Sequence, residues 1–441
     1  MELLQVCGIG ILLACLHHLF ADDVRPSIYK DEPRYINYAL SMVQHGTFGI
    51  SHNYKTNVDT PGAANTPAYP LLLAAAAYAS PALENTLLCV QQDPIEQSGC
   101  GQGYAAVLML QYGLCVLVLV ALWIMVRFWQ PNDVQSWVFP TLAVLLAAFS
   151  GVLFDAAREL RTEILILALF AWFLVAWQHF LNKPTRIVGV GLGVTLGLLT
   201  LTRPEYLYLT GFLVIAGLFW APARKQIPAL LVVFAITLSP WLARNQLHFG
   251  APLLTASSYG DTVLVQRLTY NRMESKHWIA AFVFFLPDSG DDLAAALFPQ
   301  DWYAPLKDTA NNSFMSQWIE DQRRVRAEAG DAGALGYLLT QQVLPQAPWH
   351  VMTSIPLAWR GLFVGKYFGV LGLLALCWWL FRDTKARWWM LPIAFLVALH
   401  AGVSISIPRY NIMLLFPYVI ALILAAQHQA TRHQRKFIET G

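Results

Sequence analysis

The sequence is poor in charged residues. Only 13% of its 441 residues are Asp, Glu, Lys or Arg, about half the share found in a soluble globular domain, which excludes a soluble cytosolic enzyme. An apolar content of 56% also excludes an intrinsically disordered chain. The formal net charge is only +2, so no basic surface indicates binding to nucleic acid.

Cysteine is also scarce, with six residues in the whole chain. This count excludes a disulfide-rich secreted module, and no pair has the CxxC spacing of a metal site. Four cysteines lie in apolar runs and are expected to be small apolar residues: Cys7, Cys15, Cys115 and Cys377. Cys89 and Cys100 share a turn-rich segment. We expect a disulfide there if the segment faces an oxidising compartment, and two free thiols otherwise.

Long apolar runs dominate the sequence. Blocks near 20 residues match the thickness of a bilayer core, so we expect an all-α polytopic membrane protein embedded in a lipid bilayer. Ten spans are predicted, at 2–20, 104–127, 137–154, 163–181, 187–202, 204–220, 226–243, 354–381, 388–406 and 409–427. Lys and Arg gather in alternate connections, which places these connections and both termini in the cytoplasm.

Two long segments, 21–103 and 244–353, fall on the opposite face. The predicted organisation has three parts: an N-terminal transmembrane module over 1–243 that includes the first loop, a large loop over 244–353, and C-terminal helices with a basic tail over 354–441. Apolar stretches at 67–80 and 278–286 are too short to span and are expected to lie at the interface. The Arg/Glu-rich pattern over 315–344 predicts an amphipathic surface helix.

Ionisable residues gather where the outer ends of the predicted spans meet these loops. In the first cluster, Pro33 suits the first turn of a helix, so Asp31 and Glu32 would lie at its N-terminus, where the helix dipole favours negative charge. A carboxylate in that position suits a general base. The alternative is an ordinary helix cap.

A second cluster occupies the turn between predicted spans 3 and 4. It consists of Asp155, Arg158, Glu159, Arg161 and Glu163. The three acids are spaced by four residues, so a continuous helix would place them on one face beside the arginines. The alternative is a hairpin end held by ion pairs.

The remaining clusters supply arginines. Arg203 lies in the hairpin between spans 5 and 6, Arg244 at the outer end of span 7 and Arg409 at the start of span 10. Guanidinium groups match phosphate oxygens. Arg203 could instead pair with Glu205 or extend to the interface. Acids and phosphate-matching cations on one membrane face suit an enzyme with an anionic, lipid-linked donor better than a channel or an inverted-repeat transporter.

Several short motifs resemble those of GT-C glycosyltransferases, in the branch that contains protein O-mannosyltransferases and lipid A aminoarabinose transferases. They are Asp31-Glu32-x-Arg34-Tyr35, Thr66-Pro67-x-Tyr69-Pro70, Leu160-Arg161-Thr162-Glu163, Thr202-Arg203-Pro204-Glu205, Pro240-Trp241-x-x-Arg244-Asn245 and Arg409-Tyr410. The resemblance covers residues 25–250 well and the C-terminal third loosely.

The resemblance implies inverting transfer of a sugar from a polyprenyl-phosphate donor to an envelope glycolipid or polysaccharide, at the periplasmic face of a bacterial inner membrane. Asp31 would be the general base, Glu163 a second carboxylate and Glu32 a supporting group. The implied donor-phosphate ligands are Arg203, Arg244, Arg409 and Lys30. The implied substrate contacts are Tyr35, Tyr69, Glu159, Arg161 and Glu205.

The sequence departs from that branch at two points, and two other functional classes stay as alternatives. Thr66 stands where the aminoarabinose branch has a Lys, and the chain lacks a soluble domain after its last predicted span, which favours glycolipid or polysaccharide acceptors over proteins. No cofactor follows from the sequence, although a divalent cation with ligands among Asp31, Glu163, His17 and His18 stays open. The alternatives are an O-antigen polymerase or ligase and a non-enzymatic transporter or flippase of lipid-linked saccharides.

Overall fold

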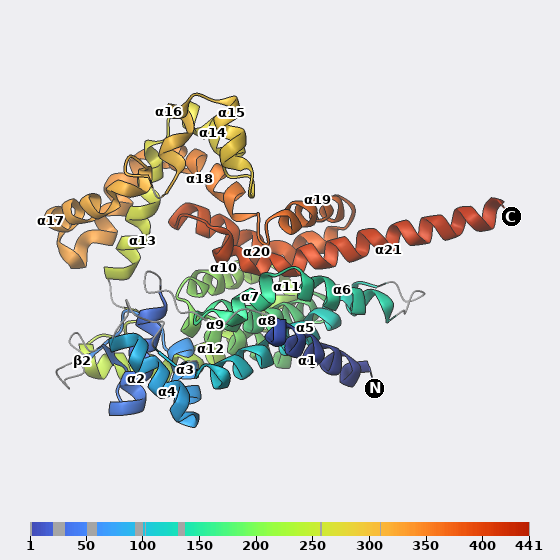
Figure 1. The fold of residues 1–441 in the computed structure, drawn as a ribbon, viewed down its shortest axis with the longest axis horizontal. Helices are drawn as coiled ribbons and strands as arrows, with labels where there is room; N and C mark the ends of the chain where they lie inside the picture. The colour runs from blue at the N-terminus through green and yellow to red at the C-terminus, as the bar shows by residue number, and fades with distance from the viewer. Residues whose placement is uncertain are drawn as a thin grey trace. The chain divides into compact units, whose positions relative to one another are not determined.

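The computed structural model describes residues 2–20, 31–50, 60–92, 100–101, 103–130, 137–255, 258–308 and 310–440. Within these ranges the regular structure is helical except for one short antiparallel pairing, β1 (Gly49–Ile50) with β2 (Thr60–Pro61). The chain forms two compact units (Figure 1). Unit 1 comprises residues 1–255 and 419–441, and unit 2 comprises residues 256–418.

Unit 1 is built from the N-terminal helices. They are α1 (Glu2–Phe20), α2 (Glu32–His45), α3 (Ala68–Ala79), α4 (Pro81–Gln92), α5 (Ala105–Trp129), α6 (Val138–Phe149), α7 (Val152–Arg158), α8 (Glu163–Asn182), α9 (Arg186–Thr202), α10 (Tyr206–Phe219), α11 (Ala221–Arg224) and α12 (Ile227–Phe249). Helix α9 packs against α8 and α12. A Cβ at Gly193 would lie 2.6 Å from Leu230 O, and one at Gly197 would lie 2.7 Å from Thr237 Cβ. Small residues one turn apart therefore let α9 and α12 approach closely.

Unit 2 holds shorter helices and the C-terminal spans. They are α13 (Ser258–Leu268), η2 (Thr269–Arg272), α14 (Ser275–Phe284), α15 (Gly290–Leu297), α16 (Gln300–Tyr303), η3 (Ala304–Leu306), η4 (Phe314–Gln317), α17 (Trp318–Tyr337), η5 (Leu338–Val343), η6 (Leu344–Gln346), α18 (Ala347–Gly361), α19 (Tyr367–Arg382), α20 (Thr384–Val403), η7 (Pro408–Leu414) and the start of α21 (Leu415–Thr440). The helical segment predicted over 315–344 is present, but it is interrupted at Gly330, whose φ is +67°.

The chain is an integral membrane protein. Within the described ranges, five helices are long and apolar enough to cross a membrane: α5, α8, α12, α20 and the segment Pro408–Arg432. The pair α6 and α7, bent by 48°, makes a sixth candidate. The ten predicted spans are not confirmed. At 1.5 Å per residue, the 17 residues of α9 extend for about 25 Å, which is less than the ~30 Å of a hydrocarbon core.

Two predictions of continuous helices are wrong. The helix predicted over 354–381 is divided into α18 and α19, because Gly365 and Lys366 have φ values of +69° and +57°. The helix predicted over 137–154 bends at Gly151, whose φ is +77°. A left-handed residue cannot continue the helical hydrogen-bond ladder. No continuous helix therefore runs through Gly151, or through Gly365 and Lys366. Lys366 therefore lies at a break and pairs with Asp288, with Nζ 2.6 Å from Oδ1.

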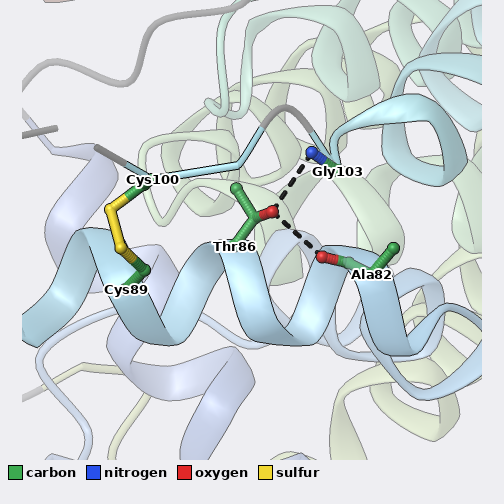
Figure 2. Close-up of a disulfide and its surroundings, with 5 residues drawn as sticks. All are labelled: Ala82, Thr86, Cys89, Cys100 and Gly103. Carbon is green, nitrogen blue, oxygen red and sulfur yellow. Dashed lines mark hydrogen bonds between the residues drawn. A yellow bond between two sulfur atoms is a disulfide. The ribbon is translucent and has the colours of Figure 1, made fainter. Parts of the chain in front are cut away.

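A disulfide joins Cys89 on α4 to Cys100, with a Cα–Cα distance of 5.6 Å. It is the pair that the sequence singles out. Figure 2 shows that the Thr86 hydroxyl lies one turn earlier on α4, where it donates to Ala82 O and accepts from the Gly103 amide. The disulfide and this hydrogen bond together hold the segment that leads into α5 against α4.

Candidate active site

The first acidic cluster lies at the start of α2. Glu32 is the first helical residue, Asp31 immediately precedes it, and Pro33 occupies the first turn. The helix start predicted from the sequence is therefore confirmed. Asp31 is partly exposed, whereas Glu32 is only 1% exposed. The two adjacent acids consequently have different access to a substrate.

Arg161 connects this cluster to the second one. Its Nε lies 3.4 Å from Glu32 Oε1, and its Nη1 lies 2.7 Å from Glu159 Oε2. Arg161 and Glu32 are both buried, while Glu159 is partly exposed. Removing one member of a buried ion pair is costly, so this pair fixes the start of α2 against the segment between α7 and α8.

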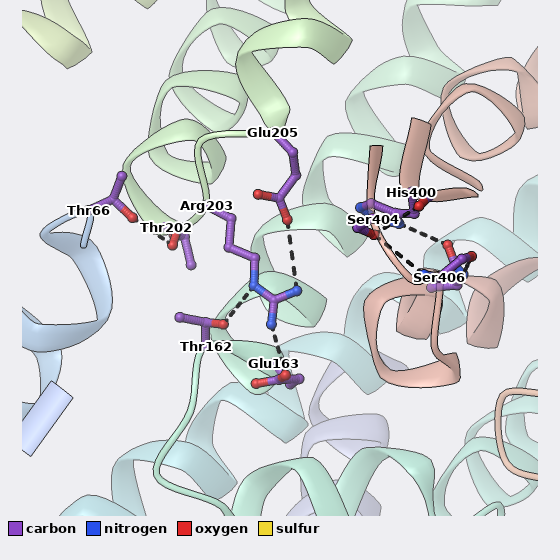
Figure 3. A network of polar contacts seen from close by, with 10 residues as sticks. Thr66, Thr162, Glu163, Thr202, Arg203, Glu205, His400, Ser404 and Ser406 are labelled. Atoms are coloured by element: carbon purple, nitrogen blue, oxygen red, sulfur yellow. Dashed lines mark hydrogen bonds and ion pairs between the residues drawn. The ribbon is translucent and has the colours of Figure 1, made fainter. Parts of the chain in front are cut away.

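Arg203 connects the second cluster to the third (Figure 3). Its Nη2 donates to Glu163 Oε1 at 2.8 Å, and its Nε donates to Thr162 Oγ1 at 2.9 Å. Its Nη1 lies 3.8 Å from Glu205 Oε1, beyond hydrogen-bond distance. Although burial opposes the charged form, Glu163 and then Glu205 raise the pKa of Arg203 above its ordinary value. The guanidinium therefore stays charged and fixes the Glu163 carboxylate at the start of α8.

Thr66 also takes part in this cluster. Its hydroxyl donates to Thr202 O at 2.8 Å and is buried, as Figure 3 shows. Thr66, which stands where the aminoarabinose branch has a lysine, thus connects the segment before α3 to the end of α9. Neither this bond nor the Thr162 contact was predicted from the sequence. Both join groups that are far apart in the sequence and meet only in the folded chain.

The two predicted substrate-contacting tyrosines, Tyr35 and Tyr69, pack together, with ring centroids 5.2 Å apart. Tyr69 is fully buried and donates its hydroxyl to Gln111 Oε1 at 2.9 Å. Burial raises the pKa of Tyr69 well above its ordinary value, and Tyr35, Glu163 and Glu32 add to this effect. The sequence analysis missed Gln111, although an amide inside an apolar run is itself a signal.

Arg244 has a different setting near the end of α12. Its guanidinium donates to Gly62 O at 2.8 Å, to Phe48 O at 2.5 Å and to Asn245 Oδ1 at 2.7 Å. It also lies 5.1 Å from the centre of the Trp241 ring. Arg244 therefore holds the ends of the β1–β2 pairing. These three bonds use three of its five N–H donors.

The other predicted residues lie elsewhere. Lys30 is outside the described residues. Arg409 belongs to unit 2, where its guanidinium lies 5.4 Å from the centre of the Tyr410 ring. In α1, His17 Nδ1 lies 3.1 Å from Tyr112 Oη, and its ring stacks on Phe154. Among the described residues no group of three or more His, Cys, Asp or Glu side chains is placed to hold a metal ion.

Charge balance distinguishes this network from a simple phosphate site. Four glutamates, Glu32, Glu159, Glu163 and Glu205, face two arginines, Arg161 and Arg203. The arginines thus serve first to hold carboxylates. Three of the four sequence clusters meet through these ion pairs, and Arg244 lies in a separate set of contacts.

No family model and no curated protein sequence matches the chain. Solved structures with a similar fold include the oligosaccharyltransferase of Archaeoglobus fulgidus in complex with zinc and sulfate, with 15% identity and a TM-score of 0.43 over 99% of this chain and 50% of that one. The archaeal oligosaccharyltransferase AglB from Archaeoglobus fulgidus, in complex with an inhibitory peptide and a dolichol-phosphate, has 13% identity and a TM-score of 0.46 over 100% and 52%. ArnT from Cupriavidus metallidurans bound to undecaprenyl phosphate has 15% identity and a TM-score of 0.41 over 95% and 76%.

These neighbours are GT-C glycosyltransferases, the superfamily that the sequence motifs resemble. The chain spans about half the length of the oligosaccharyltransferases. With TM-scores below 0.5, the similarities carry no weight in the proposal below, which depends on the residues of this chain.

Proposed function

We propose that the chain is a glycosyltransferase that moves a sugar from a polyprenyl-phosphate donor to an envelope glycolipid or polysaccharide at the extracytoplasmic face. The observation that carries the proposal is the junction of three acid–arginine clusters through Arg161 and Arg203 in a largely apolar chain. Ionisable groups buried inside a membrane protein are costly and usually have a functional role.

Asp31 is the proposed general base. A base must come within hydrogen-bond reach of the proton that it removes. Asp31 is partly exposed, whereas Glu32 and Glu163 are 1% and 2% exposed. Asp31 also precedes the N-terminus of α2, which favours a negative charge there. Among the three proposed acids, it is therefore the one that an acceptor hydroxyl reaches most easily.

Glu163 and Glu32 have supporting roles in this scheme. Arg203, itself held by Thr162, fixes Glu163, which orients a sugar, and Arg161 fixes Glu32 next to Asp31. Displacement is single and inverting. The acceptor oxygen forms a bond to the anomeric carbon as the bond to the lipid phosphate breaks, and Asp31 takes the hydroxyl proton.

The proposed phosphate ligands in unit 1 are Arg203 and Arg244, while Arg409 of unit 2 and Lys30, which lies outside the described residues, stay predictions from the sequence. Of the two acids that pair with Arg203, Glu205 is the more distant, at 3.8 Å. A phosphate oxygen would take the place of its carboxylate beside Nη1. A guanidinium held there would stabilise the negative charge that develops on the departing lipid phosphate.

The test is a transfer assay with the purified chain in nanodiscs, a panel of polyprenyl-phosphate sugars and an envelope-lipid acceptor fraction. Asp31→Asn is expected to lower turnover by about 10²–10⁴-fold, because a general base contributes that much. The matched control is Asp292→Asn, which changes an exposed aspartate in the first turn of α15 and should leave turnover unchanged. If the wild type releases no lipid phosphate from any donor, the proposal fails. Full activity in Asp31→Asn would exclude Asp31 as the base.

A further inference from the structure

Unit 2 contains a pocket of about 340 Å³ that the proposed transfer chemistry does not use. Its volume is near the lower end of the ~300–1,000 Å³ typical of small-molecule sites. It is formed by α13, η2, α17, η5 and η6. Val265 and Val325 belong to its apolar lining and are part of the core cluster between α13 and α17. One side of the pocket is therefore formed by tightly packed apolar side chains.

Most of the lining is polar. The polar lining residues are Asn271, Arg272, Asp321, Arg324, Gln342 and Gln346. Three of these are side-chain amides, each of which can donate and accept hydrogen bonds. Neighbouring sugar hydroxyls require this combination of donors and acceptors.

The charged part of the lining has a surplus of positive charge. Arg272 Nη2 lies 2.8 Å from Asp321 Oδ1, and Arg324 Nη2 lies 2.8 Å from the same oxygen. One carboxylate therefore faces two guanidinium groups, and each of these has five N–H donors. The cluster has a net charge of +1 and is suited to an anionic group.

Asn271 gives a second, independent indication of a ligand. Its Oδ1 accepts from Arg267 Nη1 and from Thr353 Oγ1, both at 3.0 Å, which fixes the orientation of the amide. Its Nδ2 is buried, and within the part of the chain that the structure describes it has no hydrogen-bond acceptor. Buried polar groups are normally satisfied, so this lining residue needs an acceptor that a ligand oxygen would supply.

Gln342 adds a third observation. It lies on η5, a π-helical turn over Leu338–Val343, and it is half-buried in the pocket wall. Turns of this type are rare and occur frequently at functional sites. The widened turn places Gln342 in the same pocket lining as the arginine cluster.

We propose that this pocket binds an acidic saccharide, a sugar unit that carries a carboxylate or phosphate group beside free hydroxyls. Arg272 and Arg324 bind the anionic group, and the amides of Asn271 and Gln342 bind the hydroxyls. This inference rests on the proposed function, because it assigns the pocket to part of the acceptor. It predicts that the acceptor glycan is acidic.

The test measures binding without any donor, using saturation-transfer NMR and the full chain in nanodiscs. The probe is a tetrasaccharide of alternating glucuronate and N-acetylglucosamine, compared with its carboxyl-reduced form, with inorganic phosphate and with a tetraglutamate peptide. Arg324→Gln should raise the dissociation constant for the acidic tetrasaccharide roughly 10- to 100-fold, as expected for the loss of hydrogen bonds to a charged group.

The matched control is Arg323→Gln. Arg323 is adjacent to Arg324, its side chain is 76% exposed, it does not line the pocket, and the substitution changes net charge equally. Unchanged affinity in Arg323→Gln and weak binding of the carboxyl-reduced probe are the expected results. Equal loss in both variants would reveal only a general surface charge and would overturn the inference.

The inference also fails if the neutral probe, phosphate or the peptide binds as tightly as the acidic tetrasaccharide. Failure of this inference is distinguishable from failure of the proposed function. A chain that turns over donor without binding the acidic probe contradicts only the pocket assignment. A chain that binds the probe but releases no lipid phosphate contradicts only the transferase.

Discussion

Arg161 and Arg203 of unit 1 and Arg267 of unit 2 are bound by groups of different kinds. In unit 1, Arg161 and Arg203 are bound by glutamates, which outnumber them. In unit 2, Arg267 is fully buried and donates to neutral groups. Its acceptors are Ala401 O at 2.6 Å, Asn271 Oδ1 at 3.0 Å, His350 O at 2.9 Å, Thr353 Oγ1 at 3.0 Å and Ser354 Oγ at 2.7 Å.

This difference separates two uses of a buried cation. The arginines of unit 1 hold carboxylates in place, and carboxylates can accept protons or bind sugar hydroxyls. Arg267 joins α13 to α18 and α20 and leaves no negative charge exposed. Burial lowers the pKa of Arg267 to about 9. The glutamate network of unit 1 therefore suits the proposed transfer chemistry, whereas the Arg267 network of unit 2 joins helices.

The largest expected effect is on the ion pair of unit 1. Arg203→Gln should lower the free energy of unfolding by about 3–5 kcal/mol, because the buried Glu163 carboxylate loses the guanidinium that donates to it. The measurement is unfolding in detergent followed by tryptophan fluorescence. The double variant Glu163→Gln/Arg203→Gln should recover most of the loss, since two amides can hydrogen-bond to each other. With Glu163→Gln measured as well, a loss in the double variant equal to the sum of the two single losses would show that the two residues are not coupled.

A smaller loss is expected at Arg267. Arg267→Met leaves neutral acceptors unfilled, at about 1–3 kcal/mol each, but it also removes a buried charge that is costly in itself. We expect a net loss of about 2–3 kcal/mol, or a thermal midpoint lower by roughly 4–12 °C for a unit of this size. The control is Arg323→Met at an exposed site. If Arg267→Met were as stable as the wild type, the cost of burying the cation would cancel its hydrogen bonds.

The sequence contains enough information for the individual elements of this comparison but not for the pairings between them. The apolar runs that become α5, α8, α12 and α20 are long enough to identify, and the Asp–Glu–Pro order predicts the start of α2. The pairing of Glu32 with Arg161 depends on contacts between segments some 130 residues apart, which no local pattern encodes.

Arg267 shows why other features of the structure could not be predicted from the sequence. A single arginine in a mixed segment of a long loop is usually a surface residue, yet here it is fully buried. The breaks at Gly151 and Gly365 were missed for another reason. Glycine is common in transmembrane helices, so its left-handed conformation at these two positions cannot be distinguished from ordinary helical glycine by composition.

The smallest expected effect is on the stability of the protein at low pH. It again separates the Arg267 network from the glutamate network. Burial, and then the charge of Arg267, lower the pKa of His350 below its ordinary 6.5. The imidazole lies between Asn271 Oδ1, 3.1 Å from Nδ1, and Gly402 O, 2.8 Å from Nε2. Below pH 6.5 the unfolded chain binds a proton at this position that the folded chain does not, so the folded state loses stability as the pH falls.

His350→Gln should therefore reduce the fall in thermal midpoint between pH 7.5 and pH 5.5, even if it lowers the midpoint at both values. The quantity to compare is the slope of the thermal midpoint against pH. Burial also lowers the pKa of His277 in the same unit, and this residue titrates in both proteins. Parallel pH profiles for the wild type and His350→Gln would mean that His350 does not restrict proton uptake. A reduced slope would show that the network around Arg267 excludes a second positive charge at His350.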